Sequence, residues 1–129
     1  SATNASQYSS KVNEMIFAEV CLLTTNVSRL AEFYKKILQT TSDCDDEIHQ
    51  AIMTAGAALT IYNNGNVKKG KNENMVIAFT VDNVDEEFIR LQQLGVKVIE
   101  PPTTRPWGAR NMLFDDPDGN HVVFRSLPT

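Results

Sequence analysis

The run Asp116-Pro117-Asp118-Gly119-Asn120 contributes most to the fold prediction for this 129-residue chain. Pro117 fixes φ near −65° at the second position of a turn, and Gly119 accepts the positive φ that completes a tight reversal. The flanking segments 111–114 and 122–124 are apolar and contain β-branched or aromatic side chains, as strands do. The sequence therefore predicts a strand, a hairpin turn and a closing strand at the end of the chain.

Upstream of this hairpin, hydrophobic periodicity predicts two helices and several short strands. One helix begins after a cap at Asn26 or Ser28, and the other begins after a cap at Asp82 or Asp85 and ends at Gly95. A strand at 96–99 is expected to stop at Pro101-Pro102. The remaining strands are predicted at 16–23, 48–54, 57–62 and 75–81.

The two halves of the chain repeat one plan. Sliding the sequence along itself places Asn26-Val27 on Asn83-Val84 and Ala31 on Phe88. We therefore expect two strand–helix–strand–strand–strand modules in an α+β fold, and one helix per module leaves a face of each sheet free to line a pocket. The predicted organisation is a flexible tail at 1–12 and a single domain at 13–129, in which modules at 14–62 and 75–126 flank a connector at 63–74.

Composition excludes several classes of function. The net charge of −4 argues against a nucleic-acid partner, which needs a basic patch. No run approaches the roughly 20 apolar residues of a membrane span, and no signal peptide is visible, so we expect a cytoplasmic location and no membrane partner. The two cysteines, Cys21 and Cys44, are too few for a disulfide framework and are expected to be free thiols, with Cys21 buried in its strand.

These motifs resemble the vicinal oxygen chelate superfamily, which contains the glyoxalase I, bleomycin-resistance and extradiol dioxygenase families. Three segments carry the resemblance: 26–38, with Asn26 in place of a common aspartate, 81–84 with Leu94-Gly95, and the turn at 116–120. The resemblance implies paired βαβββ modules that form a cupped, eight-stranded mixed sheet with helices on its outer face. It also implies a homodimer.

Enzymes of this superfamily usually hold one divalent metal ion inside the cup, on His, Gln or Glu side chains. Counted from the motifs, the four ligand positions fall on Glu19, Thr60, Val76 and Val123. Valine cannot coordinate a metal, and His121 is reached only by a shift of two residues along its strand. The chain therefore departs from the metalloenzyme pattern, is closest to the metal-free, bleomycin-resistance-like members, and is expected to use no cofactor.

Several side chains are candidates for the ligand site, each with a structural alternative. Glu19 lies in an apolar strand, where it either binds a ligand or acts as a base, or else pairs with Arg110 or Arg125 or is exposed on an edge. Trp107 either stacks on a ligand or caps the core, and Arg105 and Arg110 either bind an anion or form internal ion pairs. The predicted lining, from strand parity or loop position, is Glu19, Thr60, Tyr62, Val76, Ala78, Trp107, Arg110, Met112, His121 and Val123.

The sequence thus favours a protein that holds a small organic molecule in a cup without a metal ion. Two alternatives stay open. One is a divergent glyoxalase-like lyase, isomerase or dioxygenase, in which Glu19 is a metal ligand or the proton-transfer base and one divalent metal is bound. The other is a structural dimer whose cup is filled by its own side chains.

Overall fold

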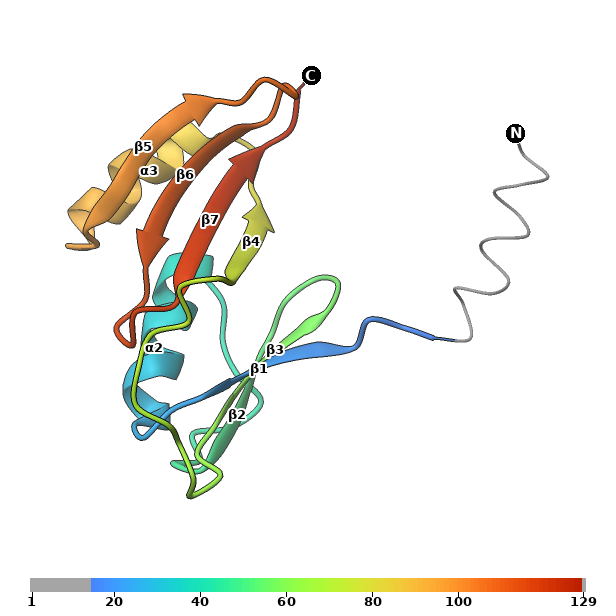
Figure 1. The fold of residues 1–129 in the computed structure, drawn as a ribbon, viewed down its shortest axis with the longest axis vertical. Coiled ribbons are helices and arrows are strands. Elements are labelled where there is room, and N and C mark those ends of the chain that lie inside the picture. The colour runs from blue at the N-terminus through green and yellow to red at the C-terminus, as the bar shows by residue number, and fades with distance from the viewer. Residues whose placement is uncertain (1–14, 129) are drawn as a thin grey trace.

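The computed structural model describes residues 15–128 and contains two helices and seven strands in that part of the chain (Figure 1). The predicted tail at 1–12 lies outside the described residues. The elements, in chain order, are β1 (Glu19–Leu23), α2 (Val27–Leu38), β2 (His49–Ile52), β3 (Ala58–Tyr62), β4 (Val76–Thr80), α3 (Val84–Gln93), β5 (Val98–Thr104), β6 (Arg110–Asp115) and β7 (His121–Ser126).

The strands form two separate sheets, one from each half of the chain. Sheet 1 has the order β1-β3-β2, and sheet 2 has the order β4-β7-β6-β5. In each sheet the first strand of the module pairs in parallel with the last strand, and the remaining pairs are antiparallel. The α+β class is therefore confirmed, and the two halves of the chain share the parallel pairing of their first and last strands.

The prediction of one eight-stranded sheet is wrong for the part of the chain that the structure describes. Sheet 1 lacks the outer strand that corresponds to β5, and Ser42 forms only an isolated bridge with Ile52 there. The acidic run that follows turns instead of extending, because Asp46 Oδ1 accepts hydrogen bonds from the backbone N–H groups of Ile48 (2.6 Å) and His49 (3.2 Å). The two sheets also do not join edge to edge.

Both helices cover the same hydrophobic core. Figure 1 shows α3 behind the strands of sheet 2, and α2 lies where the two sheets approach each other. Helix α2 buries Val27, Leu30, Ala31, Tyr34 and Ile37. These side chains belong to one cluster with buried residues of both sheets, so the two modules share a core.

Two local predictions need correction. Asn83, and not Asp82 or Asp85, caps α3, since its side chain accepts a hydrogen bond from the Glu86 backbone N–H. Strand β5 continues through Pro101 and Pro102 because it is an edge strand whose register is irregular there, so the missing N–H groups break no regular ladder. Asn26 does cap α2, as predicted. In residues 15–128 no helix has both the length and the apolar character of a membrane span.

Candidate functional site

Each sheet has one face packed on the helices and one face that no helix covers. We call the second the open face. On β7, Val122 and Phe124 are fully buried against the core, so the alternate residues His121, Val123 and Arg125 lie on the open face of sheet 2. On β1, Leu22 is buried and the alternate residues Glu19, Cys21 and Leu23 are exposed. A residue on a neighbouring strand lies on the same face as its register partner, so the strand pairing places the residues of the other strands.

The open face of sheet 2 combines apolar side chains with one hydrogen-bonded histidine. His121 Nδ1 lies 2.6 Å from Asp115 Oδ1, and each of the two side chains is about three-quarters buried. Val76 is paired with His121, and Leu113 with Val123. Because the carboxylate fixes the orientation of the imidazole ring, the second ring nitrogen is available to accept or donate a proton.

The open face of sheet 1 carries three of the predicted site residues: Glu19, Thr60 and Tyr62. Glu19 is exposed on the edge strand β1, as one of its structural alternatives stated, and it does not pair with Arg110 or Arg125, which bond Asp85 and Thr80. Thr60 is 4% exposed, and its hydroxyl has no hydrogen-bond partner among the described residues. Tyr62 packs edge-on against His49, with ring centroids 5.6 Å apart.

Two predicted lining residues are on the wrong face. Met112 is fully buried in the core, because the register across the hairpin places it opposite Phe124 and not opposite Val123. Arg110 lies on the same helix-facing side, where its guanidinium makes a bidentate ion pair with Asp85 of α3, with two N–O distances of 3.0 Å. The hydrogen bonds from Arg110 hold the pKa of the Asp85 carboxyl below its usual range.

The same register identifies open-face residues that the sequence analysis missed: Asn111, Leu113 and Asp115 of β6. Strand alternation counted back from Val123 through the hairpin could have found them. Cys21 was also placed wrongly, since it is an exposed free thiol on the open face of β1.

The loop between β5 and β6 holds the remaining candidates. Trp107 is 72% exposed, so it does not cap the core of this chain, and its ring is free to contact another molecule. Arg105 pairs with Glu100, with an N–O distance of 2.6 Å. Figure 1 shows this loop at the end of sheet 2 that lies farthest from sheet 1, so the structure does not bring it together with the open face of sheet 1.

The four positions at which metalloenzymes of the similar superfamily hold their ion occupy equivalent places in the two sheets. Their register partners are, in order, Ala58 for Glu19, Cys21 for Thr60, His121 for Val76 and Ala78 for Val123. Two valines and a threonine leave one strong ligand in this set, so the donor set does not fit a divalent metal ion. Within residues 15–128 of one chain, no group of three or more His, Cys, Asp or Glu side chains is placed to hold a metal.

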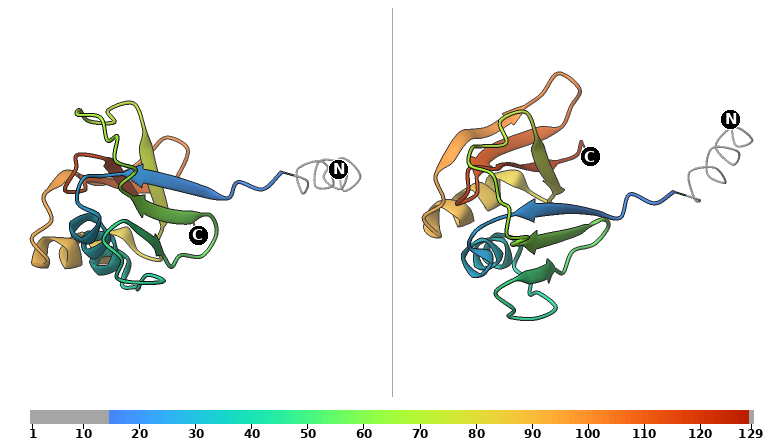
Figure 2. Two further views of the ribbon diagram at one scale, coloured as in Figure 1. Left: turned by 90° about the horizontal axis from the view of Figure 1, so that it is seen from below. Right: turned by 60° about the horizontal axis from the view of Figure 1, so that its bottom comes forward.

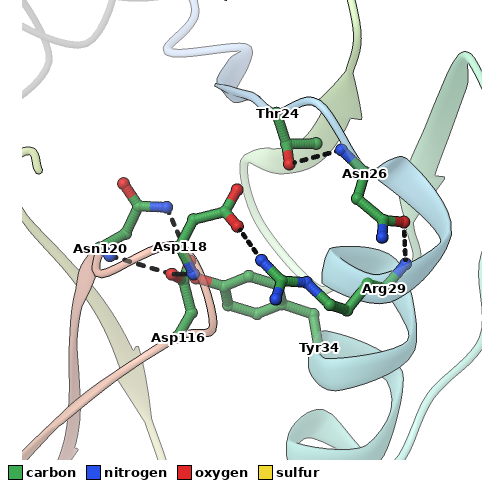
Figure 3. Close-up of polar contacts among 7 residues, drawn as sticks. All are labelled: Thr24, Asn26, Arg29, Tyr34, Asp116, Asp118 and Asn120. Carbon is green, nitrogen blue, oxygen red and sulfur yellow. Dashed lines mark hydrogen bonds and ion pairs between the residues drawn. The ribbon is translucent and has the colours of Figure 1, made fainter. Parts of the chain in front are cut away.

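The hairpin turn at residues 116–120 also joins the two modules (Figure 3). The Tyr34 hydroxyl of α2 donates to Asp116 Oδ2 at 2.6 Å, and Asn120 Nδ2 donates to the same oxygen at 2.8 Å. The backbone N–H groups of Asp118 and Asn120 donate to Asp116 Oδ1, both at 2.9 Å. Burial, and then the charge of Asp116, raise the pKa of the Tyr34 phenol.

A second contact between the modules lies beside this one. Arg29 of α2 donates to Asp118 across 2.7 Å, and Asn26 caps the same helix (Figure 3). These contacts fix the turn against the first turns of α2. The turn is therefore a structural joint between the modules, because Asp116, Asp118 and Asn120 bond to one another and to α2.

The family model described as the Glyoxalase/Bleomycin resistance protein/Dioxygenase superfamily matches residues 16–124. No curated protein matches the chain.

Similar solved structures share the fold over nearly their whole length. A protein described only as a conserved domain protein is 23% identical (TM-score 0.75, 85% of this chain and 96% of that one). A family enzyme from Burkholderia phytofirmans PsJN is 14% identical (TM-score 0.72, 87% and 98%). A lactoylglutathione lyase from Agrobacterium tumefaciens is 17% identical (TM-score 0.69, 84% and 91%). The chain therefore belongs to the glyoxalase, bleomycin resistance protein and dioxygenase superfamily.

Proposed function

We propose that this protein binds a small organic molecule between the open faces of its sheets, as a homodimer and without a metal ion. The open face of sheet 2 carries the proposal: it presents Val76, Leu113 and Val123 beside the His121–Asp115 pair, and no helix packs on it. An apolar surface with a few fixed polar groups is typical of small-molecule sites. Glu19 of sheet 1 would orient a ligand that carries a cationic or hydroxyl group.

A second copy of the chain would complete the cup, because one chain leaves both open faces uncovered. In the single chain the open-face side chains Val76 and Leu23 are 53% and 44% exposed. A second chain placed over the open faces would bury both. The strands β1 and β4 are sheet edges without a strand partner on one side in the described part of the chain.

The segment before β1 also supports a second copy of the chain as the partner. Met15, Ile16 and Phe17 are 79%, 82% and 73% exposed. Figure 2 shows this segment running out from the body of the molecule. Three consecutive large apolar side chains in water are typical of a surface that another chain covers.

Titration with the uncharged fluorescent probe N-phenyl-1-naphthylamine tests ligand binding. We expect saturable binding that Val76→Asp weakens by about tenfold or more, because the variant places a charge on the open face. The matched control is Ile89→Asp, since Ile89 is 57% exposed on α3, away from the open faces. Equal binding by both variants would contradict the proposal.

Two further measurements test the dimer and the metal independence. Light scattering should give about twice the chain mass of 14.4 kDa, and a mass of one chain would contradict the shared cup. Protein purified without chelator should contain far less than one metal ion per chain. Stoichiometric Ni, Zn, Fe or Mn would overturn the metal-free proposal.

One observation favours a second candidate, a proton-transfer enzyme. The His121–Asp115 pair has the geometry of a general base oriented by a carboxylate. The name of the lyase relative suggests lactoylglutathione as a test compound. If the wild type converts this compound and His121→Gln does not, the result would favour the proton-transfer enzyme. If the wild type does not convert it, the result would favour the binding protein.

A further inference from the structure

A groove of about 690 Å³ lies outside the open-face site described above, between the end of β1, the first turn of α2, the connector and the hairpin turn. It meets the open face of sheet 1 only at Cys21 and Leu23. Its volume is in the range of small-molecule sites. Its lining differs from that of the open faces, because it is rich in cationic side chains.

The charge in this groove is opposite to that of the whole protein. Four of the chain's twelve Lys and Arg side chains line it: Arg29, Lys68, Lys69 and Lys71. Of the sixteen acidic residues, Asp118 alone belongs to its described lining, and Asp118 already pairs with Arg29 at 2.7 Å. The groove is therefore a local positive field on an acidic protein, which attracts anions and raises their local concentration.

The lysine-bearing segment is fastened to the hairpin turn. Asn72 Nδ2 donates to Asn120 Oδ1 at 2.6 Å. The Lys71 side chain lies so close to Gly119 that a Cβ at that glycine would sit 3.0 Å from Lys71 Cγ. These contacts fix the backbone at the end of the lysine-bearing segment beside the hairpin turn, and Lys68 Nζ donates to Asn66 Oδ1 at 2.9 Å within the segment. A segment that is already fixed at one end loses less conformational entropy when it binds a ligand.

We infer that this groove is a binding site for a small polyanion, a molecule with two or more phosphate or carboxylate groups. Four cationic side chains line it, and Arg29 can donate to an anion through the guanidinium N–H groups that do not bond Asp118. A nucleic acid is the weaker fit, because a long polyanion would extend past the groove onto the acidic remainder of the surface.

Calorimetric titration of the full chain at constant ionic strength tests the inference, with pyrophosphate and citrate as separate probes and acetate as the monovalent control. We expect saturable binding of at least one dianionic or trianionic probe, weaker binding of acetate, and loss of affinity at high salt. Pyrophosphate binding alone assigns a phosphate ligand, and citrate binding alone assigns a polycarboxylate. No saturable binding of either probe would overturn the inference.

A pair of double variants with equal net charge locates the site. Lys68→Gln with Lys69→Gln should weaken binding by about tenfold or more, because it removes two of the four cations. Lys36→Gln with Lys97→Gln removes two exposed lysines outside the groove and should change affinity by less than about twofold. Equal losses in both variants would show a general charge effect and overturn the site. Neither variant touches the open-face residues, so probe binding there is a separate result.

Discussion

Tyr34→Phe tests the joint between the two modules most sharply. The substitution removes one hydroxyl, which donates to the buried Asp116 carboxylate at 2.6 Å, and it leaves the ring in the core. A hydrogen bond to a charged group contributes about 1.5–3 kcal/mol. Asp116 keeps three other donors, from Asn120 Nδ2 and from the backbone of Asp118 and Asn120, so the carboxylate is not left bare.

We therefore expect a loss of about 2 kcal/mol in the free energy of unfolding, near the lower part of that range. Urea unfolding followed by circular dichroism measures it. With a slope of roughly 2 kcal/mol per M, the midpoint should fall by about 1 M without a change in slope. Tyr62→Phe is the control, because Tyr62 is 36% exposed at the end of β3 and lies outside the joint between the modules. Equal losses in the two variants, both below about 0.5 kcal/mol, would refute the reasoning.

Three other outcomes follow from particular contacts. The pKa of Tyr34 is raised in the folded state, so the stability that its phenol contributes is complete below the unfolded pKa near 10 and is lost as the pH rises further. Between neutral and alkaline pH, the urea midpoint of Tyr34→Phe should therefore fall by less than the midpoint of the wild type. The depressed pKa of Asp85 gives stability that is present above about pH 4 and lost as pH falls, so the difference between wild type and Arg110→Ala should narrow from pH 7 to pH 3. Both Gly119→Ala and Gly56→Ala should lose about 1 kcal/mol because the glycines have a positive φ. Gly119→Ala should lose more, since only there does the new Cβ meet Lys71, and equal losses would contradict this.

The sequence predicts the local elements well because their signals are local. Asn26 caps α2 and Gly119 completes the hairpin turn, and both depend on a few neighbouring residues. The internal repeat places Asn26 on Asn83, which the structure shows to be the caps of the two helices, although Asp82 or Asp85 was predicted to cap the second.

Errors arise where the outcome depends on partners distant in the chain. The face of Met112 depends on its pairing with Phe124 across the hairpin, and a shift of one residue in that register reverses every side chain of the strand. Strand β5 tolerates Pro101 because it lies at an edge, which no local pattern reveals.

The site is predicted only in part for the same reason. Glu19, Thr60, Tyr62, His121 and Val123 do lie on open faces. Asp115, the partner of His121, was missed because the hairpin pairing was not carried from Val123 back to β6, although strand alternation would have placed Asp115 on the open face. The separation of the two sheets also has no local signal, since it depends on packing between modules.

Crystallographic screening of small uncharged fragments would show in one experiment how two chains assemble and which surface of the protein holds a ligand. We expect a dimer in which fragments collect between the open face of sheet 1, at Glu19 and Tyr62, and the open face of sheet 2, at Val76 and His121. A structure in which side chains of the protein fill that space, with fragments bound only elsewhere, would contradict it.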